Sequence, residues 1–379
     1  MRILLATDSF PPKIDGVSDT AATVAGTLAR LGHDVCVLAP APGVRDVEGS
    51  RVLRVESVPA PLYPELRLGV GLDRVIRAAR RRWDGAIVLT PGPIGAAAAL
   101  ALRREVPMVH VYTTDIPRYL KAYGLHGLAG PAAALLRRMA ARSVRTLCPT
   151  EFVRRELEAS GFPRLEVWGR GVDTGMFRPS RRSAEMRARL SGGEPEAPIV
   201  LYVGRLAREK RLDVLADVAD ALPGARLALV GDGPERAGLE RLLAGRRAVF
   251  TGYLRGVELA EAFASADVFV FPSTTDTFGQ VVLQAMAGGV PPVVVTGSAP
   301  AEFVPAGVCG LHAAPGRPEA VVAAVRRLVE DPALRVSMGI AAAEWARRFS
   351  WDALVQRLLE LLDPSRAPGA VEVPAGVAK

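Results

Sequence analysis

Short apolar runs alternate with longer amphipathic segments through the first half of the chain. A short apolar run bounded by turn residues is typical of a buried strand, whereas apolar residues three and four positions apart are typical of a helix. This pattern predicts strands at residues 2–6, 34–38 and 85–89 and helices at 17–31, 72–82 and 94–104. Alternation of strands and helices predicts a parallel sheet with helices on both faces.

A second alternation of the same kind begins at residue 199. It predicts strands at 199–204, 226–231, 248–251, 267–271, 292–295 and 310–313 and closing helices at 318–328, 332–347 and 351–362. Between the two alternations, Arg, Ser, Glu, Gly and Pro replace the apolar period. We therefore expect an α/β protein with two Rossmann-like, doubly wound parallel-sheet domains.

The expected organisation follows from these patterns. It comprises an N-terminal domain at 1–178, a linker at 179–197, a C-terminal domain at 198–350, a helix at about 351–364 that packs back on the first domain, and a mobile tail at 365–379. Doubly wound sheets bind ligands at the carboxyl ends of their strands. We expect the two domains to face each other across a cleft that holds a shared site.

The stretch at 272–291 suggests a site for a long polar ligand. It reads as a strand end, a polar loop with Asp276 and Thr277, and a helix whose formers run from 281 to 287 and stop at a Gly-Gly pair. Small residues at a helix start leave backbone N–H groups open to a phosphate. Asp276 and Gln284 would lie about 12 Å apart along a helix axis, so each could hold one end of such a ligand.

Basic residues and glycines follow other predicted strands. Arg205 and Lys210 come directly after the strand at 199–204, where a planar guanidinium and a compact ammonium both suit phosphate oxygens. Gly16 follows the first strand, and its N–H could meet a phosphate, although a turn glycine is the simpler interpretation. The loop before it lacks the Gly-x-Gly-x-x-Gly pattern, which disfavours a dinucleotide-binding dehydrogenase. Asp115, after another strand, could orient a sugar hydroxyl.

Length and composition fit this picture. A chain of 379 residues that is 49% hydrophobic can form two or three globular domains. No apolar run reaches the ~20 residues of a membrane span, and the N-terminus lacks the features of a signal peptide, so we expect a cytoplasmic protein. The three widely spaced cysteines predict buried thiols, and the histidines lack metal-ligand spacing, so no metal site is expected.

The net charge of +8 favours an anionic partner. One predicted helix carries four arginines, Arg74, Arg77, Arg80 and Arg81. This helix could lie on the anionic inner face of the cell membrane. An ordinary solvated helix face explains the same arginines. No nucleic-acid-binding motif accompanies the charge, so nucleic acid is not an expected partner.

Five motifs together carry a family resemblance. They are PPKIDGV at 11–17, WGRGVDT at 168–174, GR at 204–205 with Lys210, GDGP at 231–234 and the element from Asp276 to Gln284. In this combination the chain resembles the retaining glycosyltransferases of family four, which have the GT-B fold. It is most similar to the branch with sulfoquinovosyl- and phosphatidylinositol mannosyltransferase-like enzymes.

The resemblance implies a sugar transferase that needs no metal and no cofactor beyond its nucleotide-sugar co-substrate. The sugar of a UDP- or GDP-linked donor would pass, with retention, to the hydroxyl of a glycolipid or inositol-lipid precursor, or of a soluble cyclitol or natural product. Front-face attack would deliver the acceptor proton to a phosphate oxygen of the sugar donor.

Residue roles are carried over from the family motifs to the matching positions of this chain. Arg205 and Lys210 would hold the diphosphate with the Gly16 amide. Asp276 would contact the sugar, and Gln284 the ribose. Contacts with the sugar donor are also expected at Thr277, Phe278, Gly279 and, near the base, Leu254. The acceptor is expected at Asp15, Tyr112, Thr114 and Asp115.

Three positions depart from the family pattern. Asp276 stands where a longer Glu is usual, Gln284 replaces a second Glu, and Thr113 lies where many relatives have a His beside the sugar. A Gln side chain accepts with only one oxygen, which weakens a ribose contact by on the order of 1 kcal/mol. These departures leave a non-catalytic nucleotide-sugar binding protein as the alternative.

Overall fold

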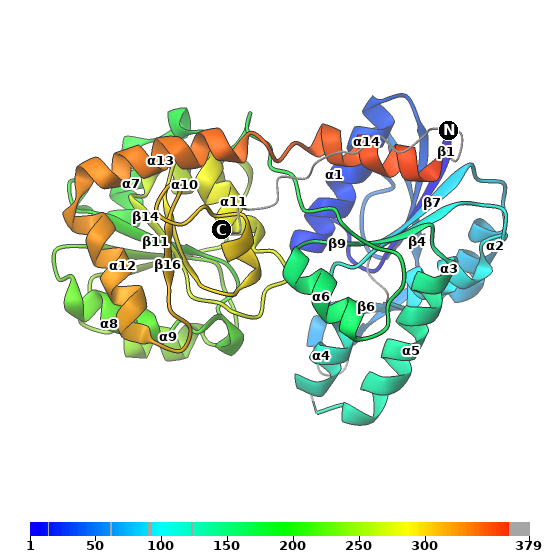
Figure 1. The fold of residues 1–379 in the computed structure, drawn as a ribbon, viewed down its shortest axis with the longest axis horizontal. Helices are drawn as coiled ribbons and strands as arrows, with labels where there is room; N and C mark the ends of the chain where they lie inside the picture. Colours follow the sequence, from blue (N-terminus) through cyan, green and yellow to red (C-terminus); the bar gives the residue numbers. More distant parts are fainter. Residues whose placement is uncertain (14, 61–62, 90–91, 123, 364–379) are drawn as a thin grey trace. The chain divides into compact units, whose positions relative to one another are not determined.

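The chain divides into two compact units, each built around one sheet (Figure 1). The first unit combines Met1–Arg170 with the C-terminal helix α14 (Trp351–Leu362), and the second spans Gly171–Ser350. The computed structural model describes residues 1–13, 15–60, 63–89, 92–122 and 124–363. The tail predicted at 365–379 lies outside these residues.

The first unit holds an eight-stranded sheet that is parallel except at one edge. Its order is β10-β9-β8-β7-β1-β2-β4-β3. The bounds are β1 (Arg2–Thr7), β2 (Asp34–Pro40), β3 (Asp46–Val47), β4 (Ser50–Val55), β7 (Gly85–Leu89), β8 (Met108–Val111), β9 (Arg145–Cys148) and β10 (Leu165–Val167). A separate antiparallel hairpin, not predicted from the sequence, joins β5 (Ser57–Ala60) to β6 (Tyr63–Gly69).

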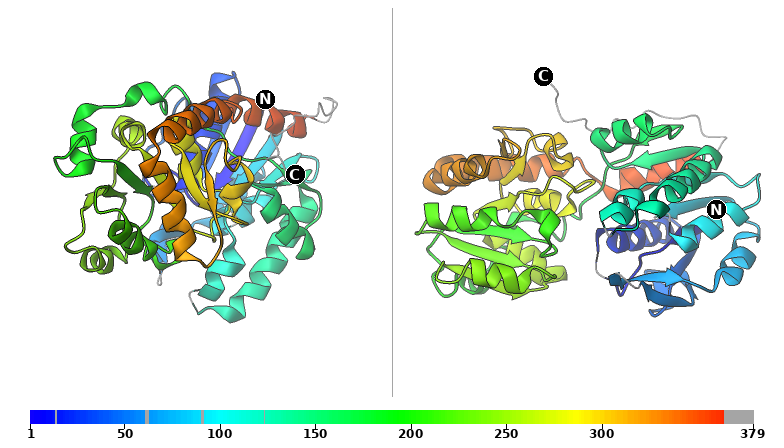
Figure 2. Two further views of the ribbon diagram at one scale, coloured as in Figure 1. Left: turned by 60° about the vertical axis from the view of Figure 1, so that its left-hand side comes forward. Right: turned by 90° about the horizontal axis from the view of Figure 1, so that it is seen from below.

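Helices cover both faces of this sheet (Figures 1 and 2). They are α1 (Gly16–Arg30), α2 (Leu72–Ala79), α3 (Pro93–Ala101), α4 (Ile116–Ala122), α5 (His126–Arg142), α6 (Glu151–Ala159) and α14. Helix α2 ends three residues earlier than predicted, because the chain leaves the helix at Arg80 to bury Trp83. Arg80 and Arg81 therefore follow α2 rather than lie on it.

The second unit has a six-stranded parallel sheet in the order β13-β12-β11-β14-β15-β16. Its strands are β11 (Ile199–Val203), β12 (Arg226–Val230), β13 (Ala248–Gly252), β14 (Val268–Phe271), β15 (Pro292–Val295) and β16 (Leu311–Ala313). Its helices are α7 (Ala184–Ser191), α8 (Val214–Ala221), α9 (Arg236–Leu242), α10 (Gly256–Ser265), α11 (Gln280–Ala287), α12 (Pro318–Glu330) and α13 (Pro332–Ala346), with 3-10 turns η1 (Pro179–Arg181), η2 (Arg208–Lys210) and η3 (Ala299–Glu302). The predicted pair of doubly wound α/β domains is confirmed.

Helix α14 completes the core of the first unit, although it comes last in the chain. Its residues Val355 and Leu358 are fully buried in the same cluster as Ile3 and Leu5 of β1. The indole Nε1 of Trp168 donates a hydrogen bond of 2.9 Å to the carbonyl of Leu354. One sheet face of the first unit is therefore covered by residues from both ends of the sequence.

The stretch at 179–197, expected to be a linker, is folded. It contains η1 and α7, and Met186 and Leu190 of α7 are buried in the core of the second unit. Ser183 caps α7 by accepting a hydrogen bond from the Met186 N–H. The polar composition concealed a short amphipathic helix, and the chain passes between units at Arg170 and Gly171 instead.

The described part of the chain contains neither a membrane-spanning helix nor a metal-binding cluster. Within it, no helix is long and apolar enough to cross a membrane. Nor do any three His, Cys, Asp or Glu side chains in that part gather as a metal site would require. The three cysteines are buried, as predicted.

Candidate functional site

The strand order of the second sheet reverses at β11. The chain runs from β11 outward through β12 to β13, then returns to β14 on the other side of β11. Loops that leave such a switch point in opposite directions open a crevice at the carboxyl ends of the strands. Arg205 and Lys210 follow β11, and Asp276 follows β14, so the sequence-predicted residues meet at this point.

Lys210 and Asp276 form a half-buried ion pair. The ammonium Nζ lies 2.6 Å from Asp276 Oδ1, and the two side chains are 17% and 20% exposed. The Phe271 ring lies 5.8 Å from the same ammonium. The other carboxylate oxygen, Asp276 Oδ2, is buried and has no hydrogen-bond partner among the described residues. Asp276 thus holds Lys210 in place and keeps one acceptor oxygen available.

Helix α11 begins beside this pair with its first turn uncapped. Gly279 is its N-cap with a φ of 85°, and within the described part of the chain no side chain accepts a hydrogen bond from its first amides. A Cβ at Gly279 would come within 2.6 Å of Pro300 Cγ, so only glycine fits there. Unsatisfied N–H groups give a helix start a partial positive charge that attracts phosphate. An anion at this helix end would also be close to Lys210.

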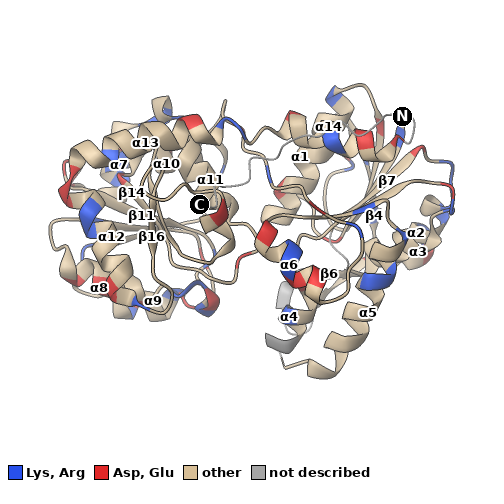
Figure 3. Cartoon of the chain, viewed as in Figure 1, with Lys and Arg blue, Asp and Glu red and all other residues tan. Residues whose placement is uncertain are grey.

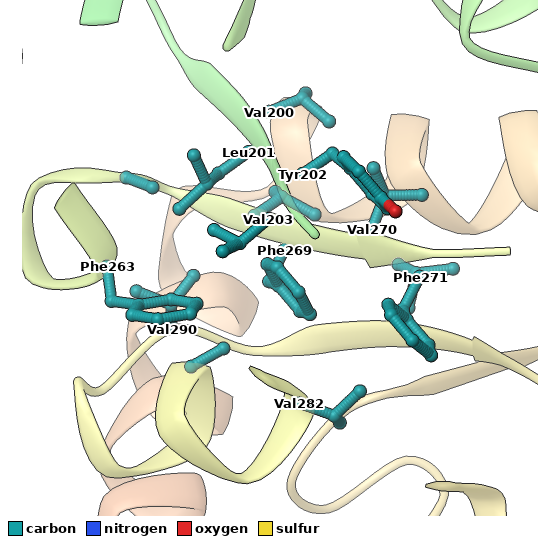
Figure 4. Packing of buried hydrophobic residues seen from close by; sticks show 14 of the residues in the cluster. Val200, Leu201, Tyr202, Val203, Phe263, Phe269, Val270, Phe271, Val282 and Val290 are labelled. Atoms are coloured by element: carbon teal, nitrogen blue, oxygen red, sulfur yellow. The ribbon is translucent and has the colours of Figure 1, made fainter. Parts of the chain in front are cut away.

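A buried aromatic stack supports the loop after β11. Tyr202 is buried and stacks on Phe271 with ring centroids 6.4 Å apart (Figure 4). Its hydroxyl donates a hydrogen bond of 3.0 Å to the Arg205 carbonyl. Burial raises the pKa of Tyr202 well above 10, so the hydroxyl keeps its proton and remains a donor. Sequence reasoning treated Tyr202 only as a strand residue and missed this supporting role.

The remaining predicted contacts of the second unit differ in exposure. Thr277 and Gln284 are half-buried, and the Gln284 side chain makes no hydrogen bond within the described part of the chain. Phe278 is buried and stacks on Phe303 at 4.6 Å, and Leu254 is buried in the same core. Only the main chain of Phe278 and Leu254 is therefore placed to meet a ligand.

In the first unit, Asp15 is the N-cap of α1. Its Oδ1 accepts hydrogen bonds from the N–H groups of Val17 and Ser18, at 3.0 and 2.7 Å. Its Oδ2 accepts from the Ser9 hydroxyl and lies 2.9 Å from Lys13 Nζ. Burial alone would raise the pKa of Asp15, but Lys13 and these hydrogen bonds lower it below its ordinary value. Both carboxylate oxygens are engaged within the protein, which makes capping the role that the structure gives to Asp15.

Gly16 is fixed by a buried arginine that sequence reasoning did not single out. Arg170 donates from Nη1 to the Gly16 carbonyl at 3.1 Å and to the Thr20 hydroxyl. Burial lowers the pKa of Arg170 to about 10, with Asp15 and Asp19 opposing the shift, so the guanidinium stays charged at neutral pH. Its position between two glycines in the 168–174 motif was the available signal.

The residues predicted to bind the acceptor after β8 share one loop. Tyr112 is buried against Phe162, and burial together with Asp115 raises its pKa far above 10. Asp115 accepts a hydrogen bond from the Arg118 N–H at the start of α4. Thr113 is buried and Thr114 is half-buried. This loop can offer hydroxyl and carboxylate groups, with Tyr112 kept as a neutral phenol.

Asp8 and His110 are buried ionisable groups that the sequence did not reveal. Asp8 accepts hydrogen bonds of 2.9 Å from the Ile94 and Gly95 N–H groups at the start of α3. Burial raises its pKa to about 6 despite these bonds. His110 on β8 is fully buried without a hydrogen-bond partner in the described structure, and burial lowers its pKa to about 4. Both side chains are buried, so their protonation is coupled to the stability of the first unit.

Comparison with known proteins follows the same two-part division. Residues 14–175 match the family model described as Glycosyltransferase Family 4, and residues 188–345 match Glycosyl transferases group 1. The chain is 37% identical over 370 residues to a GDP-mannose-dependent alpha-mannosyltransferase of Mycobacterium tuberculosis, covering 95% of both chains. It is also 37% identical over 341 residues to sulfoquinovosyl transferase SQD2 of Arabidopsis thaliana, covering 87% of this chain and 67% of that protein.

A solved structure agrees in fold. Alr3699/HepE of Anabaena, crystallised with UDP-glucose, superposes with a TM-score of 0.76 at 21% identity, covering 96% of this chain and 99% of that one. The parallel sheets of the two units, the two family matches and the near full-length match to the mycobacterial relative all lead to one classification. The chain belongs to glycosyltransferase family 4 and is a glycosyltransferase with the GT-B fold.

Proposed function

We propose that the second unit binds a nucleoside diphosphate sugar and that the first unit binds the acceptor whose hydroxyl receives the sugar. One observation carries the proposal: the Lys210–Asp276 pair beside the uncapped start of α11. It combines a cation for phosphate, a helix end for phosphate and a buried oxygen that can accept from a sugar hydroxyl. GDP-mannose is the first candidate, since the mycobacterial relative is named GDP-mannose-dependent, with UDP-glucose second because HepE was crystallised with it.

The chemistry assigned to the site balances as a substitution at the anomeric carbon. The bond from that carbon to the diphosphate oxygen breaks, and a bond to the acceptor oxygen forms. In the retaining, front-face course, the acceptor proton passes to the departing phosphate oxygen. Lys210 and Arg205 lower the barrier by stabilising the negative charge that develops on the diphosphate. All the groups that we propose to act in this step are side chains of the protein or atoms of the two substrates.

Asp276 gives this site a specific geometry. Lys210 binds Oδ1, and Oδ2 is the oxygen without a partner in the described structure, so we assign Oδ2 to a sugar hydroxyl. A glutamate would place its carboxylate one methylene further out. We infer that the shorter side chain sets how deeply the sugar enters the site. Asp276→Glu should therefore change the relative kcat/KM for different sugars more than it changes the Kd for the nucleotide without a sugar.

A transfer assay tests the proposal directly. Purified protein is incubated with radiolabelled GDP-mannose or UDP-glucose and either an inositol-lipid extract or soluble cyclitols, and label is followed into the acceptor fraction. Transfer with one pair supports the proposal and identifies the acceptor class. Nucleotide-sugar binding by calorimetry without transfer to any acceptor would instead support the non-catalytic alternative.

A lipid acceptor is the choice that the basic surface of the first unit favours. Arg74, Arg77, Arg80 and Arg81 are exposed on and after α2, where only Arg77 has an ion-pair partner among the described residues, Asp73. Figure 3 colours the basic residues of the chain blue. Exposed arginines of this density attract anionic headgroups in a salt-dependent way. We propose that this surface, rather than a membrane-spanning segment, would bring the enzyme to an anionic bilayer.

Vesicle sedimentation checks the membrane proposal. The protein should sediment with phosphatidylserine-containing vesicles but not with phosphatidylcholine alone, and 0.5 M salt should release it. Glutamine at all four arginines should abolish sedimentation. The matched control carries glutamine at four exposed arginines of the second unit, Arg317, Arg326, Arg327 and Arg347. Equal loss in both variants would mean that net charge, not this surface, determines binding.

A further inference from the structure

Gln280 is the first residue of α11, and its side chain reaches back to a residue 109 positions earlier in the chain. Its amide nitrogen Nε2 donates a hydrogen bond of 2.8 Å to the carbonyl of Gly171. Gly171 is buried, and it is the residue at which the chain enters the second unit. The bond therefore ties the start of the proposed phosphate-binding helix to the point where the chain passes between the units.

A series of aromatic rings makes a second connection between the same two places. Phe278 stacks on Phe303 with ring centroids 4.6 Å apart, and Phe303 meets Phe349 edge-on at 5.9 Å. The carbonyl of Phe349 accepts a hydrogen bond of 2.9 Å from the Val172 N–H. The start of α11 is thus connected to one short segment of chain from both sides of its N-cap.

The contact with Gly171 fixes the orientation of the Gln280 amide. A carbonyl oxygen only accepts, so the nitrogen of the amide must face it. The amide oxygen Oε1 is then buried without a partner among the described residues. An unpaired buried acceptor costs at least as much stability as one hydrogen bond contributes. A methionine would fill similar space without that cost, so stability alone does not favour glutamine at this position.

The residue before Gly171 makes the corresponding contact in the first unit. Arg170 is buried and donates to the carbonyl of Gly16, the first residue of α1. Two adjacent residues of the 168–174 motif therefore each hold the first residue of a helix, one in each unit. This gives a physical role to a motif that the proposed binding residues leave unexplained.

We infer that Gln280 is a positioning residue, whose bond to Gly171 fixes the first turn of α11 where negative charge develops on the departing diphosphate. The inference rests on the proposed function of the second unit and assigns a role to a side chain outside the groups proposed to act. Electrostatic stabilisation depends on donors that are in place before the charge develops. A displacement of about 1 Å can lower the rate by up to about 100-fold. The tether therefore contributes to the rate of transfer rather than to the stability of the fold.

Gln280→Met tests this separation, because it keeps the length of the side chain and loses the donor. For transfer from GDP-mannose or UDP-glucose, whichever the wild-type protein uses, kcat should fall by about tenfold while KM rises by less than about threefold. The urea midpoint should equal or exceed that of the wild-type protein. Gln280→Asn keeps the amide but is one methylene shorter, so it should lose kcat to a similar extent.

Arg335→Met is the control for a general loss of stability in the same unit. It removes hydrogen bonds of 2.9 and 3.0 Å to the carbonyls of Leu328 and Val329. This variant should lower the urea midpoint and keep kcat within about twofold of the wild-type value. The two variants should thus move stability and rate in different ways.

Hydrogen exchange with GDP or UDP supplies a readout that needs no acceptor. In the wild-type protein, the nucleotide that binds should slow exchange in peptides at 278–287 and also at 168–177, because the tether joins the two segments. In Gln280→Met, the slowing at 278–287 should persist and that at 168–177 should be lost.

Two results would overturn the role of Gln280 alone. One is a wild-type kcat in Gln280→Met, and the other is a fall in kcat that accompanies an equal fall in the urea midpoint of both methionine variants. Failure of the wild-type protein to transfer sugar from either nucleotide sugar would overturn the proposed function, and the role of Gln280 with it. The wild-type assay therefore separates the two failures.

Discussion

The two units use the same structural element in opposite ways. Each sheet has a switch point from which the chain continues on both sides, between β1 and β7 in the first unit and between β11 and β14 in the second. In each, a helix starts directly after the second strand of that pair: α3 follows β7, and α11 follows β14. The first amides of α3 donate to the carboxylate of Asp8, whereas among the described residues no side chain accepts from the first amides of α11.

The difference separates a structural helix start from a binding one. Asp8 satisfies the α3 amides from inside the protein, so an external anion has nothing to gain there. At α11 no side chain in the described structure accepts from the corresponding amides, and Lys210 pairs with Asp276 just ahead of the helix. Two other carboxylates differ in the same way. Asp15, the N-cap of α1 in the first unit, uses both oxygens within the protein, whereas Asp276, ahead of α11 in the second unit, has no partner at Oδ2 among the described residues. The candidate ligand site therefore differs from the capped helix starts of the first unit in its hydrogen-bond donors and acceptors without internal partners among the described residues, not in the types of residue present.

Removal of the cation at α11 should have the largest effect. Lys210→Ala should reduce kcat/KM for the sugar donor by about 10²–10³-fold, because it deletes a charge that stabilises the departing diphosphate. Arg208→Ala, in the same turn but exposed, should stay within threefold. Steady-state kinetics with the identified sugar donor measure both variants. Similar kinetics for the two would refute the asymmetry between the units.

Acid titration should expose two opposing groups in the first unit. Asp8 has a raised pKa of about 6, so its contribution is full below pH 3.8 and is lost as the pH rises through 6. His110 has a lowered pKa of about 4, so its contribution is full above pH 6.5 and is lost as the pH falls through 4. Each amounts to about 3 kcal/mol, and between pH 6.5 and 4 they nearly cancel.

Single variants break that cancellation. Relative to the wild-type protein, Asp8→Asn should lose about 3 kcal/mol of stability between pH 6.5 and 4, and His110→Met should gain a similar amount. Hydrogen exchange of peptides from β1 and β8 reports the first unit alone. Parallel pH profiles for all three proteins would show that neither group titrates as its burial implies.

A side chain at Gly279 should close the open helix start of α11. Gly279→Ala combines a left-handed φ with contact to Pro300, and should cost the second unit about 2 kcal/mol while weakening nucleotide binding. Gly297→Ala is the matched control, because Gly297 has a φ of 78° but open space around its missing Cβ. The control should lose stability through backbone strain but retain nucleotide affinity. Urea unfolding and calorimetry together separate the two effects.

Gln284→Glu should have the smallest effect. If Gln284 contacts the ribose, a carboxylate there accepts from both hydroxyls and should tighten binding by about 1 kcal/mol, or roughly fivefold. Titration with the preferred nucleoside diphosphate measures the gain. Unchanged affinity would mean that the pocket has adapted to the amide.

The sequence predicted the second unit's candidate site better than the first's. Arg205, Lys210 and Asp276 each follow a strand of strongly apolar residues, so the strand order alone brings them together. Asp8 was missed because its helix partner lies more than eighty residues away, across the β1–β7 pairing. No local pattern encodes that contact.

Two other differences had local signals that were available. Asp15 lies two residues before the predicted helix at 17–31, and it is the N-cap because the helix begins one residue earlier, at Gly16. Met186 and Leu190 are four residues apart in the stretch expected to be a linker, which is the spacing of a helix face. In the second case polar composition outweighed a short pattern, because a helix of eight residues gives few positions from which a period can stand out.

The return of α14 to the first unit has a consequence for biosynthesis. While the chain is being made, the face of the first sheet that includes Ile3 and Leu5 stays incompletely covered until Trp351–Leu362 leaves the ribosome, after the whole second unit has been synthesised. The later unit can therefore complete its core before the earlier one. During that interval an exposed apolar sheet face is a natural substrate for chaperones, and translation that stops before residue 351 leaves it permanently open to aggregation.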